Sequence, residues 1–460
     1  MCVKKNEHTK RSTFSGKFGY VMAAAGSAVG LGNIWRFPYL AAKYGGGIFL
    51  LFYLLFSVTI GYTLIISESA LGRMTKKSPV GAFKAFSNKP TSKAFGWINA
   101  VVPMLIAPYY CVIGGWVTKY FVEYLKGSVH ELAQDQYFGE FISNSVSVEF
   151  WFILFSVITL LVVFFGVAKG VERVSKFVMP LLIVIAVLIA GYSITCPGAE
   201  AGVKYMLIPN FKNFSIMTVV SAMGQVFYSL SIGMGILYTY GSYLKKDVDI
   251  EASTNQVIAF DTAIAILSAL MIIPAVFAFS NGSPETLNAG PALMFITLPK
   301  VFNSLGFGTI GGLLFFILVF FAALTSSISL VETSVSTFQD ELHWSRKKSL
   351  SLMAVLTLVL GSFSALGFGV FQKVQLPHIG GILDIFDFIT NSVMMPIGAA
   401  ATCFLIIRLV GINKIEKEVK LSSKFKMQKM YTIMIQYIIP VCLLIVLLSS
   451  IANAFGLITI

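Results

Sequence analysis

The stretch Gly-Ser-Ala-Val-Gly-Leu-Gly-Asn-Ile-Trp-Arg-Phe-Pro occupies residues 26–38, inside the first long apolar segment of the chain. Each of its glycines costs roughly 0.5–1 kcal/mol relative to alanine in a helix interior. Asn33 and Arg36 add polar groups that hydrocarbon cannot satisfy. Irregular backbone at membrane depth is tolerated only where it packs inside protein or lines a cavity. The stretch therefore predicts a broken helix and a binding site halfway across a membrane.

The composition identifies the rest of the chain as membrane-embedded. Hydrophobic residues make up 56% of the 460 residues, and phenylalanine alone occurs 40 times. This is the composition of an all-α polytopic membrane protein rather than a soluble domain. The basic N-terminal segment shows no cleavable signal pattern. Apolar windows of ~20 residues predict eleven spans, at 18–40, 46–72, 97–121, 149–167, 177–195, 216–242, 256–279, 307–333, 350–370, 379–407 and 431–455.

The net charge of +13 would suit a nucleic-acid-binding protein, but its distribution argues against that partner. Most lysines and arginines lie in the N-terminus and the even-numbered connections between spans. This asymmetry places the N-terminus in the cytoplasm and, with eleven spans, the C-terminus outside. We therefore expect a lipid bilayer and no nucleic acid as the partner. The odd-numbered connections beyond the second span contain Lys119, Lys126, Lys204, Lys212, Lys300 and Lys373.

A second interrupted stretch, residues 225–235, lies within the sixth span, where glycines and serines again break an apolar run. Spans one and six are each the first of five, so the chain predicts two inverted repeats, 18–195 and 216–407. The span at 431–455 then completes a single transporter domain over 1–460. Glycines also let membrane helices pack closely. Paired breaks at matching places, however, are typical of a transporter binding site.

Acidic residues inside predicted spans are few, and a charge at the bilayer centre costs about 2.5–3.5 kcal/mol on insertion scales. Asp384 and Asp387 lie near the outer surface, where solvation accounts for them equally well. Glu68 is expected to form a local ion pair with Arg73. Neither solvation nor a local ion pair explains Asp261, so we predict a functional role for it. The acidic residues within or at the ends of spans are Glu68, Asp261, Glu332, Asp384 and Asp387.

The eighth span carries consecutive hydroxyls at Thr325 and Ser326, close to Ala322. Such hydroxyls often bond back to the i−4 carbonyl, which is the structural alternative. Together with a freed carbonyl they also form the neutral oxygen set that hard cations prefer.

The rival classes of membrane protein are less well supported. A channel should present repeated polar faces or a filter loop, and an enzyme a nucleophile–base pair or metal-ligand spacing. The scattered cysteines and histidines show no zinc or disulfide spacing. We therefore expect a secondary transporter, not an enzyme, and no organic cofactor.

These motifs resemble the neurotransmitter:sodium symporter family, and the resemblance runs through nearly the whole chain in order. The missing twelfth span is similar to the bacterial eleven-span members, among them carriers of aromatic and other hydrophobic amino acids. The matching stretches are GSAVGLGNIWRFPYLAAKYGGGIFLLFY (26–53), SESALGR (67–73), APYYCVIGGW (107–116), GQVFYSLSIGMG (224–235), ITLPKVF (296–302) and FFAALTSSISLVE (320–332).

The resemblance implies a leucine-transporter-like fold, a 5+5 inverted repeat in which helices one and six are unwound. It implies two Na⁺ ions as the coupling ions. One would be held by Gly26, Val29, Ala322, Thr325 and Ser326. The other would be held by Ala28, Asn33, Ser229, Asp261 and the substrate carboxylate.

The resemblance also implies a set of substrate contacts, in which Tyr110 and the backbone near Leu31 meet the carboxylate and the remaining apolar side chains set the substrate's size. A flexible Met234 suits large side chains. The implied contacts are Ser27, Ala28, Leu31, Gly32, Ile106, Tyr110, Tyr228, Ser229, Ser231, Met234, Ser326 and Leu330.

The function implied is Na⁺-coupled symport of hydrophobic or aromatic L-amino acids by alternating access, in a bacterial plasma membrane. Chloride-dependent relatives place the anion near positions matching Tyr53, Gln225 and Ser229. Asp261 brings a carboxylate to that place, so no chloride requirement is expected. Gates are implied between Arg36 and Asp387 outside and between Arg11 and Asp340 inside. The preferred amino acid, the ion stoichiometry, proton counter-transport, the oligomeric state and any protein partner stay open.

Overall fold

The computed structural model describes residues 12–280, 290–304 and 308–457, and these ranges are almost entirely helical, without a β-strand. Nine helical runs in these ranges are long and apolar enough to cross a membrane. They are α3–α4 (Gly47–Thr75), α6 (Pro90–Lys126), α9 (Ser145–Phe164), α10 with its preceding π-helical turn (Val167–Thr195), α14 (Ile250–Phe279), α16 (Gly308–Leu342), α17 with a short 3₁₀ turn (Arg346–Phe368), α18–α19 (Ile382–Val410) and α21–α22 (Gln428–Ala454).

The first predicted span is interrupted where its glycines lie. It consists of α1 (Lys17–Ala28), a π-helical turn (Gly32–Arg36) and α2 (Phe37–Lys43). Val29, which ends α1, has extended backbone angles. The predicted break in this helix is confirmed.

The sixth predicted span is divided in the same way. It consists of α12 (Ile216–Ser229) and α13 (Ile236–Ser242), with unwound chain between them. In that segment Ser231, Gly233 and Gly235 have φ of +54°, +74° and +69°. This left-handed region is costly for most residues but open to glycine. With the two broken helices, the nine continuous runs make the predicted eleven spans.

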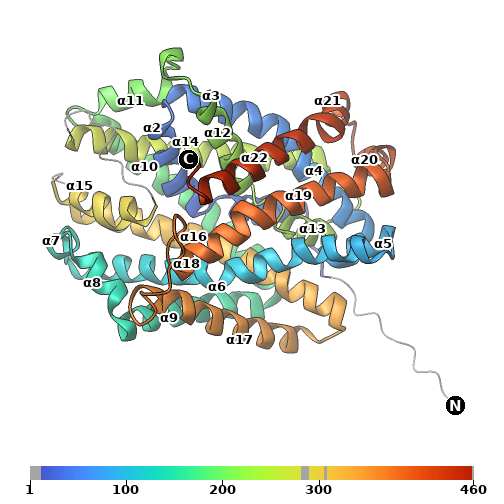
Figure 1. Cartoon of the computed structure of the whole chain (residues 1–460), viewed down its shortest axis with the longest axis horizontal. Coiled ribbons are helices and arrows are strands. Elements are labelled where there is room, and N and C mark those ends of the chain that lie inside the picture. Colours follow the sequence, from blue (N-terminus) through green and yellow to red (C-terminus); the bar gives the residue numbers. More distant parts are fainter. Residues whose placement is uncertain (1–11, 281–289, 305–307, 458–460) are drawn as a thin grey trace.

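Short helices between the spans gather at two opposite ends of the molecule (Figure 1). One end carries α5 (Pro79–Phe86) and α20 (Ile412–Val419), and we call it the α5 end. The other, the α15 end, carries α15 (Leu298–Ser304) together with α7 (Val129–Leu132), α8 (Tyr137–Ser143) and α11 (Glu200–Leu207). Since successive connections alternate between the two ends, the helices cross the molecule as membrane spans do.

Two helices extend well beyond their predicted spans. The span predicted at 97–121 belongs to a helix over Pro90–Lys126, which starts with a proline and stops at Gly127 with φ +84°. The span predicted at 307–333 runs to Leu342. Hydropathy detects the part of a helix that lies in hydrocarbon, whereas the helix itself continues until a cap ends it.

Glu68 does not form the expected pair with Arg73, and this prediction is wrong. Residues five apart lie about 140° apart around a helix, so the two side chains leave α4 (Tyr62–Thr75) in different directions. Arg73 Nε lies 2.6 Å from Glu418 Oε1. Glu68, fully buried, accepts a hydrogen bond of 2.9 Å from the backbone N–H of Gly233 in the unwound segment.

Candidate functional site

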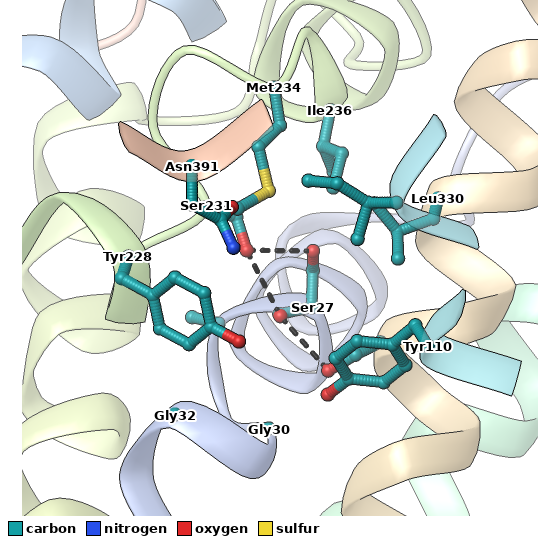
Figure 2. Close-up of a pocket in the computed structure, with 13 residues that line it drawn as sticks. Ser27, Gly30, Gly32, Tyr110, Tyr228, Ser231, Met234, Ile236, Leu330 and Asn391 are labelled. Atoms are coloured by element: carbon teal, nitrogen blue, oxygen red, sulfur yellow. Dashed lines mark hydrogen bonds between the residues drawn. The ribbon is translucent and has the colours of Figure 1, made fainter. Parts of the chain in front are cut away.

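The two unwound segments meet each other near the middle of the molecule. The Ser231 hydroxyl donates to the carbonyl of Ser27 at 3.1 Å, and the two hydroxyls lie 3.3 Å apart. Ser326, on α16, lies 3.2 Å from the same carbonyl. The two breaks and the eighth span therefore come together at one point, as Figure 2 shows.

A small cavity lies at this meeting point. In the view of Figure 2, Met234, Ile236 and Leu330 lie on one side of Ser27, and Gly30 and Gly32 lie on the other. The cavity thus has an apolar part and a part next to freed backbone. Its lining residues are Ser27, Ala28, Gly30, Gly32, Ile106, Tyr110, Tyr228, Ser231, Met234, Ile236, Ser326, Leu330 and Asn391.

Most of the predicted substrate contacts line this cavity, but Leu31 and Ser229 do not. The backbone N–H of Leu31 donates to the Tyr110 hydroxyl at 3.1 Å. The Ser229 side chain instead donates to Asp261 at 2.7 Å, behind the cavity wall. Their placement follows from the backbone, which turns the Leu31 N–H toward Tyr110 and the Ser229 hydroxyl away from the cavity.

Asp261 is fully buried and held by neutral donors. Its carboxylate accepts from the Tyr53 hydroxyl at 2.6 Å, the Asn33 amide at 2.8 Å and the Ser229 hydroxyl at 2.7 Å. Ion pairing does not compensate this carboxylate within the described residues. Hydrogen bonds from neutral donors stabilise a buried carboxylate only in part, so the cluster is suited to receive a cation.

The proposed ligands of the first sodium ion come together. The Ser326 hydroxyl lies 3.4 Å from the carbonyl oxygens of both Gly26 and Val29. The Thr325 hydroxyl bonds to the Ala322 carbonyl at 3.2 Å. A methyl group added to Gly26 would lie 3.2 Å from Thr325 Cβ, so these two pairs are neighbours. This oxygen set, from carbonyls and hydroxyls, fits a hard monovalent cation.

Only some of the ligands predicted for the second ion contact one another. Asn33, Ser229 and Asp261 contact one another, with the Asn33 amide 3.0 Å from the Ser229 hydroxyl. Ala28 lines the cavity nearby.

The predicted outer gate residues face a second, larger cavity. Arg36 and Asp387 both line it. In the described part of the chain, no ion pair within 4 Å joins the Arg36 guanidinium and the Asp387 carboxylate. The Arg36 guanidinium lies over the Tyr228 ring, 4.8 Å from its centroid. Tyr228 lines both cavities and so separates them.

The predicted inner gate is only partly described. Arg11 lies outside the described residues, and Asp340 accepts from the backbone N–H of Ser78 at 2.6 Å. Nearby, the Tyr243 hydroxyl donates to Glu332 at 2.8 Å, and Glu332 forms an ion pair with Arg346.

Three residues of the cavity wall were not predicted: Gly30, Ile236 and Asn391. Gly30 sits in the quoted break, and Ile236 directly follows the glycines of the second, so their positions beside the breaks were the available signal. Asn391 lies within the tenth span between Thr390 and Ser392, where no cluster of glycines marked a break.

Comparison with known proteins agrees with this geometry. The profile of the "Sodium:neurotransmitter symporter family" matches residues 11–131 and 122–457. An uncharacterized sodium-dependent transporter of Bacillus subtilis (strain 168), YhdH, is 36% identical over 95% of this chain and 97% of its own length. The human sodium- and chloride-dependent GABA transporter 2 is 28% identical over 77% of this chain and 66% of its own.

One solved structure is similar to this chain in both fold and sequence. The crystal structure of MhsT in complex with L-phenylalanine superposes with a TM-score of 0.86 at 37% identity, covering 96% of this chain and all of that one. Fold and site thus define a multi-pass membrane transporter, not an enzyme. The chain belongs to the sodium:neurotransmitter symporter family, whose members are sodium-dependent transporters. The predicted family and leucine-transporter-like fold are confirmed.

Proposed function

We propose that this protein couples Na⁺ entry to uptake of hydrophobic and aromatic L-amino acids by alternating access. The observation that carries the proposal is the cavity at the two helix breaks. Freed N–H and carbonyl groups suit the carboxylate and ammonium groups shared by all amino acids. The opposite wall, with Met234, Ile236 and Leu330, suits an apolar side chain. The similar protein MhsT was solved with L-phenylalanine, which supports this substrate class.

In this proposal two Na⁺ ions bind as co-substrates. The first is held by the set around Thr325 and Ser326, and the second by the Asp261 cluster and Ala28. The second ion also contacts the substrate carboxylate, which gives substrate and ion a mutual dependence. Asp261 replaces chloride as the balancing negative charge, so transport is chloride-independent.

The proposal also fixes the orientation. The lysine and arginine asymmetry favours an orientation with the N-terminus and the α5 end in the cytoplasm and the C-terminus outside. The resemblance to the bacterial eleven-span members supports a bacterial plasma membrane as the location. The repeats at 18–195 and 216–407 then move relative to each other to expose the site to either side, with 431–455 outside the repeats.

The test is uptake of labelled phenylalanine into proteoliposomes with an inward Na⁺ gradient. We expect Thr325→Val with Ser326→Ala to lower sodium affinity by about tenfold or more, because two ligands are lost at nearly constant volume. Thr333→Val with Ser334→Ala is the matched control, since these hydroxyls on the same helix bond only to the Ser329 and Leu330 carbonyls at 2.9 Å.

Unlabelled amino acids then compete for uptake in the same assay. Aromatic and aliphatic substrates are expected to compete best. Undiminished accumulation in K⁺ buffer without Na⁺ would refute the coupling, and stronger competition by glycine or glutamate would refute the substrate class.

A further inference from the structure

Asn391 lines the inner cavity and donates a hydrogen bond to Asp387, which lines the outer one. It lies in a π-helical turn (Phe388–Met394) that follows α18 (Ile382–Asp387). Such turns re-aim side chains and are frequent at functional sites. Its side chain lines the inner cavity, and Figure 2 shows it pointing into the space that Met234 and Tyr228 also face.

The orientation of the Asn391 amide is set by its neighbours. Its Nδ2 donates to Asp387 Oδ1 at 2.5 Å and to the Tyr109 hydroxyl at 3.2 Å. An ionised carboxylate accepts hydrogen bonds and does not donate them, so the amide nitrogen must face Asp387. The other amide atom, Oδ1, therefore bonds to neither Asp387 nor Tyr109.

This Asn391 oxygen is buried and has no hydrogen-bond partner. Among the described side chains that line the cavity, only Asn391 has a buried polar atom without a hydrogen-bond partner. A buried acceptor without a partner costs free energy that a donor would recover. Its neighbours on the apolar wall, Met234 and Ile236, supply no hydrogen-bond donor.

We propose that Asn391 Oδ1 accepts a hydrogen bond from a donor on the substrate's side chain, so that the site prefers tyrosine or tryptophan to phenylalanine. This inference rests on the proposed function and narrows its substrate class. Tyrosine and tryptophan combine a large apolar ring with one polar hydrogen. A site built to bond such a hydrogen discriminates against the analogue that lacks it.

The test uses two phenylalanine analogues of nearly equal size, para-amino-phenylalanine with a donor and para-methyl-phenylalanine without one. Each displaces labelled phenylalanine from the purified transporter in Na⁺ buffer. The wild type should bind the amino analogue about fivefold or more tighter than the methyl analogue, as one net hydrogen bond allows. In Asn391→Leu the ratio should fall to near one, and Asn391→Ser serves as a smaller change if the leucine variant does not fold.

Tyr109→Phe is the matched control. It removes a partner of the amide nitrogen but leaves Oδ1 in place, so the ratio should stay at the wild-type value. A wild type that does not prefer the amino analogue overturns the inference by itself, as does a ratio that is unchanged in both Asn391 variants. If labelled phenylalanine does not bind in Na⁺, the proposed function fails instead.

Discussion

At the scale of single residues, the proposed charge balance of the site rests on Asp261. Buried carboxylates are rare in membrane spans because of their cost, and this one has three neutral donors around it. The human GABA transporter relative is named as chloride-dependent. In our proposal, this fixed carboxylate near the second sodium site provides the negative charge that chloride would otherwise bring.

Replacing chloride with gluconate should therefore leave wild-type uptake unchanged. Asp261→Ser keeps a small oxygen but removes the charge, so external chloride should stimulate uptake by this variant. Asp249→Ser is the control, because Asp249 caps the same helix by accepting from the Ala252 N–H at 2.9 Å and serine caps equally well. Uptake by the Asp249→Ser variant should not depend on external chloride. A wild type that stops in gluconate would contradict the charge-balance argument.

At the scale of elements, close packing of α4 against α13 positions one end of the second break. The Cβ that alanine would place at Gly72 meets the backbone carbonyl of Tyr238, and one at Gly241 would lie 2.5 Å from the carbonyl of Ser69. Backbone atoms cannot move aside as a flexible side chain can. Both glycines are therefore required by the approach of two helices, as is common in membrane proteins.

We expect Gly72→Ala to destabilise the protein by about 1–3 kcal/mol, the usual cost of overpacking. Gly224→Ala is the matched control, since an added methyl group there would have nothing within 4 Å and alanine favours the helix. Thermal unfolding in detergent should show a lower midpoint for Gly72→Ala and an equal or higher one for Gly224→Ala. Equal midpoints for the two variants would contradict this packing.

At the scale of the whole molecule, a cavity opens at one end, whereas packed aromatic rings close the other. At the α15 end the larger cavity reaches Tyr228. Toward the α5 end, Phe14 is buried with its ring 5.6 Å from that of Tyr240 and 5.8 Å from that of Tyr243, in edge-to-face contact. The molecule is thus closed on the side that we propose faces the cytoplasm.

Phe14→Ala should weaken this closure, because it removes the ring on which both tyrosines pack. We expect faster hydrogen exchange of backbone amides in α13 (Ile236–Ser242), measured by mass spectrometry. Phe211→Ala, at a ring that is 71% exposed, is the control and should leave α13 unchanged. The same exchange rate in both variants would show that Phe14 does not hold this end closed.

Local chemistry determined the parts of the fold that the sequence predicted. Apolar length sets the number of spans, and clustered glycines beside polar residues weaken a helix locally, so the interruptions near Gly30 and Gly233 were predictable. The grouping of Thr325 and Ser326 with the first break followed from the family's motifs. Substrate and sodium binding by these residues stay predictions.

Tertiary structure alone decided which groups meet across elements. Whether Glu68 pairs with Arg73 or with the Gly233 N–H depends on how α4 is rotated against the second break. Asn391 reaches the cavity because a π-helical turn directs it there while Asp387 holds its nitrogen. The contact between Glu68 and Gly233 joins residues 165 positions apart, and the Arg73–Glu418 ion pair joins residues 345 positions apart. They depend on the packing of whole helices, which no local pattern records.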